Sequence, residues 1–342
     1  MVTTVALVLA GGTGTRLYPA SRADRPKQFL DFGGEGSLLA RTVDRVAFAD
    51  ETYVLTGDRY AEAVREHAPR AGVLVEPTGK DTGPALAYAA RRIREQVDDA
   101  VLVCVPSDHH VDGDFATVAG HACEVAVETG GLVTMGVEPT RAATGYGYIE
   151  PAGSFEDGGG DPADGVAPVA SFREKPDEVT AHELVDAGCL WNAGIFAWTP
   201  DAFLRECRGT PLEPVATADD PAEGFARAEA LSVDYAVLER TDDAYVVPAA
   251  FDWDDLGAWD ALERLTDAGL GVEDRDGNAV LGDGLTVDAS GNVVASDEKH
   301  VSLVGVDDLV VAAFDDRVLV VPKDEAQRVR EVVSALREEN LF

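Results

Sequence analysis

The first half of the chain alternates short apolar runs with longer segments that are apolar at every third or fourth position. The short runs predict buried β-strands over residues 4–10, 52–56, 72–76, 100–106 and 131–137. The longer segments predict amphipathic helices over residues 37–47, 59–68, 84–97 and 117–129. Strands and helices that alternate in this way are typical of βαβ units and of a parallel sheet covered on both faces. Because ligands of such sheets bind beyond the carboxyl ends of the strands, we expect the chemistry there.

The pattern changes after about residue 145. Residues 147–150 and 166–174 predict antiparallel strands, and the loop between them, 151–165, is rich in Gly and Asp and receives no function. Residues 278–321 predict short strands broken at glycines, as in a small β domain of stacked turns. A terminal helix is predicted over residues 324–339.

The chain has 342 residues, of which 46% are hydrophobic, and this is enough to bury a sizeable core. At roughly 150 residues per domain, one large domain and a smaller one are expected. The change of pattern places the large domain at residues 1–268 and a small C-terminal β domain with its terminal helix at residues 269–342.

The charge of the chain is extreme, with 63 acidic and 28 basic residues and a formal net charge of −35. Nucleic acid is not an expected partner, because its phosphates would be repelled. Such a surface also repels itself in dilute buffer, whereas at molar salt the Debye length falls to about 3 Å. The composition therefore predicts a halophilic protein adapted to a salt-rich cytoplasm, and simple tuning of solubility is the alternative.

No run of about 18 apolar residues occurs, so we expect no membrane span. The N-terminal residues lack a basic region and lead directly into a predicted strand, so we expect no signal peptide. The four cysteines show no CxxC spacing, and Cys104 lies inside an apolar run where a core position is expected. A reduced, cytoplasmic protein without a disulfide framework or zinc site is predicted.

The strongest local signal is LAGGTGTRL at residues 9–17, where a predicted strand meets a glycine-rich turn. Backbone N–H groups of such a turn can approach and bind an anion. A P-loop would end in Gly-Lys-Ser/Thr, and a dinucleotide fingerprint would have a third glycine where Leu17 stands. A simple tight βα turn is the alternative, but Arg16 favours a triphosphate because it adds a fixed cation.

Lys27, in the stretch Arg25-Pro26-Lys27-Gln28, is one of only five lysines. An ammonium group can meet a phosphate as a point charge in a way that a guanidinium does not, although a solvated surface lysine is the alternative. Asp108 follows a predicted strand, where it could hold a metal or cap a following helix. Three further carboxylates stand close together at Asp252, Asp254 and Asp255, and Mg²⁺ is typically held by one or two carboxylates with phosphates and water. Asp252 and Asp254 could instead be part of the acidic surface.

The stretch LAGGTGTRLYPASRADRPKQFL resembles the sugar-1-phosphate nucleotidyltransferase family, and in this longer form the mannose-1-phosphate guanylyltransferases. The resemblance implies an α/β fold with a Rossmann-like mixed, mainly parallel sheet of the nucleotide-diphospho-sugar transferase type. It also implies a small C-terminal β-helix-like domain and a possible homodimer. The implied activity is Mg²⁺-dependent transfer of GMP from GTP to mannose 1-phosphate, with release of pyrophosphate.

The resemblance also assigns roles to residues. It implies a catalytic set of Arg16, Lys27 and Asp108, and a metal site of Asp108 and Asp255, the latter in a Trp-x-Asp-x-Gly pattern. The implied nucleotide-binding residues are Leu9, Ala10, Gly11, Gly12, Gly14, Thr15, Arg16, Lys27, Asp81, Thr82, Pro84 and Asp108. The implied sugar-phosphate-binding residues are Gly147, Glu174, Lys175 and Asn192.

Several alternatives stay open at this point. The family commonly has Asn-Thr-Ala-Pro where this chain has Asp-Thr-Gly-Pro at residues 81–84, so base selectivity is not fixed. Glu174 and Lys175 could form an ordinary exposed ion pair, worth about 1 kcal/mol or less. A uridylyl- or thymidylyltransferase acting on glucose 1-phosphate and a non-catalytic sugar-nucleotide sensor are the competing functions. The isomerase domain of some longer family members is missing from this sequence, so isomerase activity is not expected.

Overall fold

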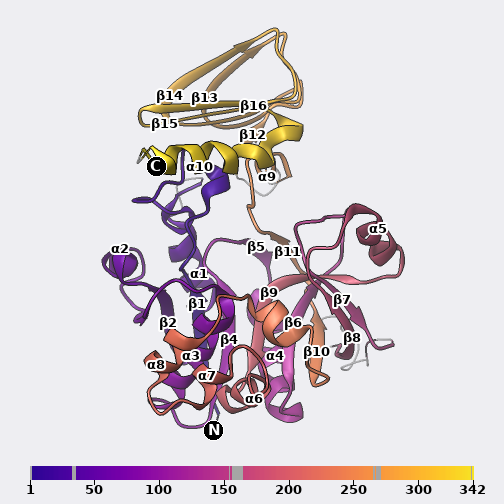
Figure 1. Ribbon diagram of the computed structural model, residues 1–342. Helices are drawn as coiled ribbons and strands as arrows, with labels where there is room; N and C mark the ends of the chain where they lie inside the picture. Colours follow the sequence, from indigo (N-terminus) through magenta and orange to yellow (C-terminus); the bar gives the residue numbers. More distant parts are fainter. Residues whose placement is uncertain are drawn as a thin grey trace. The chain divides into compact units, whose positions relative to one another are not determined.

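The computed structural model describes residues 2–32, 36–153, 155, 165–264, 266, 271–339 and 341–342 (Figure 1). The chain divides into two compact units that interleave along the sequence. The first unit comprises Met1–Gly11, Val43–Pro106 and Val111–Trp253, and the second comprises Gly12–Thr42, Ser107–His110 and Asp254–Phe342. The domain boundary predicted between residues 268 and 269 lies outside the described residues.

A mixed sheet forms the centre of the first unit. In the described residues its strand order is β3-β2-β1-β4-β9-β6-β10-β8-β7. The strands are β1 (Thr3–Leu9), β2 (Glu51–Gly57), β3 (Gly72–Glu76), β4 (Ala100–Pro106), β6 (Leu132–Val137), β7 (Tyr148–Pro151), β8 (Ala167–Arg173), β9 (Leu190–Trp198) and β10 (Ala244–Pro248). Strands β3, β2, β1 and β4 are parallel to one another, whereas β9 runs antiparallel between β4 and β6. The α/β class and the mixed sheet are therefore as predicted.

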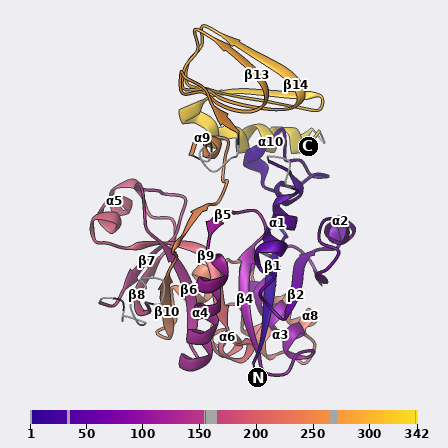
Figure 2. The same cartoon turned by 180° about the vertical axis from the view of Figure 1, so that it is seen from behind.

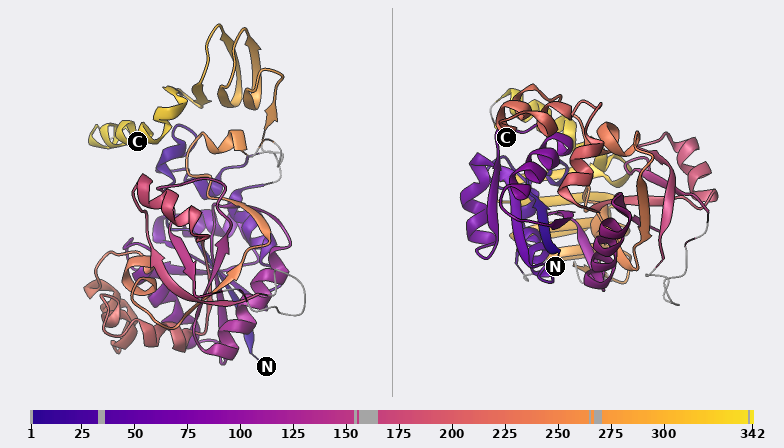
Figure 3. Two further views of the ribbon diagram at one scale, coloured as in Figure 1. Left: turned by 90° about the vertical axis from the view of Figure 1, so that its right-hand side faces the viewer. Right: turned by 90° about the horizontal axis from the view of Figure 1, so that it is seen from below.

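Helices lie on both sides of this sheet, as Figure 3 shows in the view from below. They are α2 (Ala61–His67), α3 (Thr82–Arg94), α4 (Phe115–Thr129), α5 (Glu178–Asp186), α6 (Pro200–Glu206), α7 (Glu213–Thr217) and α8 (Pro221–Arg227), with a 3₁₀ turn η3 (Asp58–Tyr60) and a π-helical turn η5 (Asp234–Leu238). Helix α1 (Leu38–Arg45) runs across the division between the two units. Because both faces are covered, β4 is buried along its length up to Pro106, which explains its continuous apolar run.

The core of the first unit is built mainly from the apolar faces of its helices and central strands. The stacked rings of Trp198 and Phe203, whose centroids are 4.4 Å apart, are part of it. Cys104 is fully buried there, as predicted, and within the described residues all four cysteines are buried and free. Strands β7 and β8 pair antiparallel, as predicted, but most of the loop between them lies outside the described residues. None of the helices in the described ranges is long and apolar enough to cross a membrane.

The second unit contains a sheet of stacked turns. Its strands, in the order in which they pair among the described residues, are β12 (Val272–Glu273), β13 (Ala279–Val287), β14 (Val293–Val304), β15 (Leu309–Phe314) and β16 (Arg317–Pro322). Figure 2 shows β13 and β14 side by side, and β13, β14 and β15 are parallel. Asn278 and Asn292 occupy equivalent positions in successive turns, and the Asn292 amide donates to Asn278 Oδ1 at 2.8 Å. This ladder fits the stacked turns predicted from the sequence.

Further short elements accompany this sheet. The predicted terminal helix consists of a 3₁₀ segment, η6 (Lys323–Arg328), and α10 (Val329–Glu338), while α9 (Ala261–Arg264) precedes the sheet. The 3₁₀ turns η1 (Thr15–Leu17) and η2 (Lys27–Phe29) also belong to the second unit. Strands β5 (His110–Gly113) and β11 (Phe251–Asp254), each of which runs across the division in sequence, pair with each other.

The segment after the glycine-rich turn packs against the C-terminal β domain inside the second unit. Leu17, Tyr18 and Trp259 share one apolar cluster with buried residues of β13 to β16 and α10. The Trp259 indole N–H donates to the Tyr18 carbonyl at 2.8 Å. No local pattern in the sequence identifies these two segments as partners, because they are separated by more than 200 residues.

Candidate active site

The carboxyl edge of the parallel strands carries the first predicted site residues. Strand β1 ends at Leu9, and Ala10 is fixed by two bonds to β2: its N–H donates to Leu55 O at 2.8 Å, and its carbonyl accepts from the Thr56 hydroxyl at 2.9 Å. Gly11 follows and is exposed. A Cβ added at Gly11 would lie 3.2 Å from Glu76 Oε1, so the backbone at Gly11 lies close to the side chain of the last residue of β3.

Glu76 is a functional candidate that the sequence interpretation missed. Its side chain is 7% exposed, and burial raises its pKa to about 7. Burying a carboxylate is costly unless it gains partners, and displaced pKa values concentrate at functional sites. No motif in the sequence separates Glu76 from an ordinary strand-end residue.

Asp81, Thr82 and Pro84 lie at the start of α3, which follows β3. Asp81 is the N-cap, and its carboxylate accepts from the Thr82 N–H at 2.7 Å. Its φ of 72° and ψ of 175° form a strained backbone conformation that residues other than glycine rarely adopt. A Cβ at Gly83 would lie 2.5 Å from the Leu231 carbonyl, so the glycine that departs from the family pattern has a packing reason.

In the second unit, Gly14 brings the glycine-rich turn against Lys27. Its φ is 60°, and a Cβ there would lie 2.2 Å from Lys27 Cβ, so only glycine fits. The Ser21 hydroxyl donates to the Gly14 carbonyl at 2.6 Å and fixes the turn further. Thr15 and Arg16 follow in η1, and Arg16 is exposed. Gly12 is exposed and has no atom within 4 Å of an added Cβ.

Lys27 joins the predicted catalytic and metal-binding residues. It is 4% exposed, so it is not the solvated surface lysine of the alternative interpretation. Its Nζ lies 2.9 Å from Asp108 Oδ2 and also donates to the backbone carbonyl of Asp255. One buried ammonium thus contacts both segments that were expected to hold a metal.

Asp108 lies just beyond β4, at the predicted strand end. The helix-cap alternative is wrong, because β5 follows Asp108 and the cap of α4 is Asp114, which accepts from the Thr117 N–H at 3.2 Å. Burial alone would raise the pKa of Asp108. The charges of Lys27 and His109 nevertheless hold it below its usual value, so the carboxylate stays ionised.

The three neighbouring carboxylates after β10 differ in environment. Asp252 is exposed, as the acidic-surface interpretation expected. Asp254 is a correction to that interpretation, because it is buried, accepts from the Leu256 N–H at 2.8 Å and pairs with Arg264 at 2.8 Å. Because Asp254 is buried and paired with Arg264, we interpret it as a structural residue.

The Asp255 carboxylate lies against the backbone of Gly257. Its Oδ1 accepts from the Gly257 N–H at 3.0 Å, and a Cβ at Gly257 would lie 2.7 Å from Oδ2. The glycine of the Trp-x-Asp-x-Gly pattern therefore makes room for this carboxylate.

The donor set of Asp108 and Asp255 fits Mg²⁺. Among the described residues, no group of three or more His, Cys, Asp or Glu side chains could hold a metal by itself. Such a closed group suits structural zinc, whereas Mg²⁺ usually takes one or two carboxylates and completes its shell with phosphates and water. The space kept free at Gly257 allows the Asp255 carboxylate to take part.

The first unit brings the four predicted sugar-phosphate residues together. A Cβ at Gly147 would lie 2.4 Å from Glu174 Oε2, and the Gly147 carbonyl accepts from the Asn192 N–H at 2.8 Å. Glu174 is nearly buried and pairs with the half-exposed Lys175. Partial burial opposes the charge of Lys175, but its hydrogen bond to Glu174 raises its pKa. The pair is therefore not the fully exposed one of the alternative.

Asp234, which the sequence interpretation missed, completes this cluster. The Asn192 side-chain oxygen accepts from the Thr134 hydroxyl at 3.1 Å. The NH₂ group of Asn192 donates to Asp234 Oδ1 at 2.9 Å. Burial raises the pKa of Asp234 to about 6, with a further contribution from the Glu174 charge. Asp234 lies in the π-helical turn η5, and such turns are frequent at functional sites.

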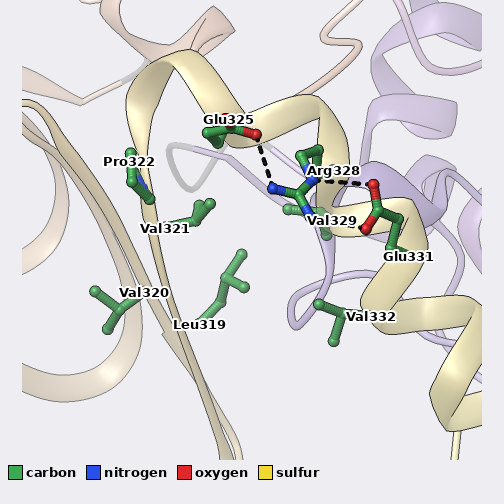
Figure 4. Close-up of a pocket in the computed structure, with 9 residues that line it drawn as sticks. All are labelled: Leu319, Val320, Val321, Pro322, Glu325, Arg328, Val329, Glu331 and Val332. Atoms are coloured by element: carbon green, nitrogen blue, oxygen red, sulfur yellow. Dashed lines mark hydrogen bonds and ion pairs between the residues drawn. The ribbon is translucent and has the colours of Figure 1, made fainter.

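A groove of about 410 Å³ lies elsewhere in the second unit, between β16 and the η6–α10 segment (Figure 4). It contains none of the predicted site residues. Its lining residues are Leu319, Val320, Val321, Pro322, Glu325, Arg328, Val329, Glu331 and Val332.

The fold and the glycine-rich edge define an α/β protein of the nucleotide-binding class. Residues 5–270 match the family model described as Nucleotidyl transferase, and the chain therefore belongs to this family. Residues 282–336 match the model described as MannoseP isomerase/GMP-like beta-helix domain. The small C-terminal β-helix-like domain predicted from the sequence is thus confirmed.

Relatives and a solved structure resemble this chain over nearly its full length. The xanthan biosynthesis protein XanB of Xanthomonas campestris pv. campestris strain B100 is 36% identical over 97% of this chain and 73% of its own. The mannose-1-phosphate guanylyltransferase of Klebsiella pneumoniae is 33% identical over 97% of this chain and 74% of its own. A crystal structure described as mannose-1-phosphate geranyltransferase from Thermus thermophilus is 36% identical, with a TM-score of 0.85 over 98% of this chain and 100% of that one. The resemblance drawn from the opening motif is confirmed.

Proposed function

We propose that this protein is a mannose-1-phosphate guanylyltransferase, which transfers GMP from GTP to mannose 1-phosphate and releases pyrophosphate. The activity named for the Klebsiella relative supports the reaction. The observation that carries the proposal is the contact of the buried Lys27 ammonium with Asp108 and with the backbone of Asp255. A buried cation beside an ionised carboxylate suits a reaction between two phosphates, in which charge must be offset.

The reaction needs no protein base. A phosphate oxygen of mannose 1-phosphate attacks the α-phosphorus of GTP and forms a new oxygen–phosphorus bond. The bond from that phosphorus to the oxygen bridging the β-phosphorus breaks, and pyrophosphate leaves with the electron pair. Because the attacking phosphate is already anionic near neutral pH, the protein contributes by positioning the substrates and by offsetting charge.

The roles of the nucleotide-binding residues follow from their chemistry. Arg16 and the backbone N–H groups of the glycine-rich turn would bind the β- and γ-phosphates. Lys27 would offset the charge that gathers near the α-phosphate. Asp108 and Asp255 would hold Mg²⁺, which when bound neutralises charge on phosphate oxygens.

Base selection belongs to the edge that carries Glu76 and Asp81. A carboxylate can accept from both the N1–H and the amino group of guanine, and Asp81 retains a carboxylate oxygen beyond its capping bond. Glu76 is a second acceptor close to the glycine-rich turn. Their presence favours guanine over bases that lack this pair of donors.

The sugar phosphate would bind at the cluster of Gly147, Glu174, Lys175 and Asn192. Glu174 would accept hydrogen bonds from sugar hydroxyls, and Lys175 would meet the phosphate. The Asn192 NH₂ has a second hydrogen, besides the one it gives to Asp234, for a sugar oxygen.

We also propose a cytoplasmic location, a halophilic character and a homodimer. The buried, free cysteines within the described ranges are consistent with a reducing compartment, and the net charge of −35 is consistent with high salt. The molar mass in solution, measured by light scattering in molar KCl, tests the homodimer.

The reaction is tested by pyrophosphate release in molar KCl with Mg²⁺, pairing GTP, UTP, dTTP and ATP with mannose or glucose 1-phosphate. We expect release with GTP and mannose 1-phosphate only. Release with another pair would retain the mechanism and overturn the substrates. Silence from every pair, with the protein folded at that salt, would favour the non-catalytic sensor.

A further inference from the structure

We infer that the β15–β16 turn of the C-terminal domain positions the nucleotide loop, which we define as residues 14–27, through two arginines on that loop. Asp315 and Asp316 of the turn are positioning residues, and Arg22 and Arg25 are their partners. The inference rests on the proposed function for its effect on turnover, but the underlying contacts can be tested without any activity.

The two arginines contact the turn directly. Arg25 donates to Asp315 Oδ2 at 2.8 Å. Arg22 donates to Asp316 Oδ1 at 3.0 Å and to the Phe314 carbonyl at 3.2 Å. The partners are about 290 residues apart in sequence, so these contacts fix tertiary arrangement rather than local structure.

The same guanidinium groups also hold the loop in its own conformation. The Arg22 Nε donates to the Pro19 carbonyl at 3.2 Å, and the Arg25 Nε donates to the Ala20 carbonyl at 3.1 Å. The backbones of Arg22 and Arg25 exchange hydrogen bonds of 2.9 and 3.2 Å. Each arginine therefore links the folded loop to the turn. Because the guanidinium is planar and rigid, its bond within the loop and its bond to the turn constrain each other.

The loop so held carries the groups that meet phosphates. It begins at Gly14, ends at Lys27, and its two ends are packed against each other, since no Cβ fits between them. Pro26 alone separates Arg25 from Lys27, whose Nζ contacts Asp108 at 2.9 Å. A shift of the arginines would thus move the lysine, and misplacement by about 1 Å can lower a rate by about a hundredfold.

Global stability is a poor explanation for these pairs. The side chains of Asp315 and Asp316 are 48% and 74% exposed, and exposed ion pairs contribute about 1 kcal/mol or less. The turn itself is fixed independently, because the Asp315 N–H donates to Asp297 Oδ2. The turn is therefore a firm support for the loop, and its carboxylates can be altered without unfolding the domain.

The test is the double variant Asp315→Asn/Asp316→Asn. The matched control is Glu325→Gln/Glu331→Gln, which neutralises two acids that pair with Arg328 in the same domain. We expect the test variant to retain its Tm while kcat falls and the KM for GTP rises, each by about tenfold or more. The KM for mannose 1-phosphate should stay unchanged, and the control should match the parent protein.

Two further measurements keep the inference falsifiable. Hydrogen exchange of the Leu17 and Tyr18 amides, which bond to Gly14 and Thr15 within the loop, should be faster in the test variant and unchanged in the control. The charge-exchanged variant Arg25→Asp/Asp315→Arg should recover part of the lost turnover relative to either single change. Unchanged exchange rates would overturn the inference whether or not the parent protein is active. Inactivity of the parent with every substrate pair would instead overturn the proposed function.

Discussion

Single residues explain much of the candidate site, and Gly257 is the sharpest case. A Cβ there would lie 2.7 Å from the Asp255 carboxylate, so Gly257→Ala should displace that group with little change in the fold. We expect the Mg²⁺ concentration for half-maximal pyrophosphate release to rise about tenfold, as when the support of a metal ligand is lost. Mn²⁺ binding followed by electron paramagnetic resonance should weaken in parallel.

The control for this change is Gly120→Ala, at a helical glycine with no atom within 4 Å of the added Cβ. It should leave both Mg²⁺ dependence and Mn²⁺ binding unchanged. A Gly257→Ala variant that binds Mn²⁺ like the parent would remove Asp255 from the metal site.

The buried carboxyl of Glu76 predicts a pH-dependent stability. Its ordinary pKa of 4.5 is raised to about 7 in the folded state by burial, so between these values the folded state binds more protons than the unfolded state. Stability is therefore lost as pH rises through this window, by at most about 3 kcal/mol. Glu76→Gln should be more stabilising, relative to the parent, at pH 8 than at pH 5.

This prediction is checked by chemical denaturation at the two pH values in molar KCl. Glu62→Gln, at an exposed carboxyl of α2, is the matched control. If the advantage of Glu76→Gln is the same at both pH values, Glu76 is not a carboxyl that burial keeps protonated.

The residues that the sequence could predict are those with a local motif. The glycine-rich turn, Lys27, Asp108 and Asp255 stand in patterns whose chemistry is readable, and the structure brings the last three into contact. Glu76 and Asp234 could not be found in this way. Each is one acidic residue among 63, and only its tertiary surroundings distinguish it: burial for Glu76 and the bond from the Asn192 amide for Asp234.

At the scale of elements, the π-helical turn η5 and strand β9 act together. Asp234 of η5 accepts from the Asn192 amide of β9 at 2.9 Å and so orients it toward the sugar-phosphate cluster. Asp234→Ala leaves this amide without its acceptor, and a lost hydrogen bond to a charged group costs about 1.5–3 kcal/mol. We expect the KM for mannose 1-phosphate to rise about tenfold or more, with the KM for GTP unchanged.

Steady-state kinetics with each substrate varied in turn decide this prediction. Asp219→Ala is the control, because it removes an exposed carboxylate from the same unit. Equal rises in both KM values would point to a general loss of structure, and no rise in either would separate Asp234 from the sugar site.

The periodicity of the sequence predicts the elements themselves well. Strands β1 to β4 and helices α2 to α4 fall where the apolar runs and the three-to-four-residue period place them. The order of the sheet could not be derived in this way. Strand β9 enters between β4 and β6, and β10 lies between β6 and β8, because pairing across long separations depends on tertiary packing and not on local pattern.

At the scale of the whole molecule, acidic residues outnumber basic ones by 63 to 28. Many of the basic groups in the described part of the chain are already engaged, as Arg22 and Arg25 are with the β15–β16 turn and Arg264 is with Asp254. The remaining acidic surface has few partners of its own, and its mutual repulsion opposes the compact state. High salt should relieve that repulsion without new contacts.

We therefore expect Tm to rise with KCl between about 0.1 and 2 M, and most steeply below about 1 M, where the Debye length falls from about 10 to about 3 Å. Sucrose separates screening from general exclusion of a solute, because it strengthens burial and carries no charge. If Tm rises steeply at low KCl and only gradually with sucrose, salt stabilises the fold by screening the repulsion between acidic residues. A Tm that is flat or falling in KCl would mean that the acidic surface does not oppose folding, and the charge would then be a matter of solubility alone.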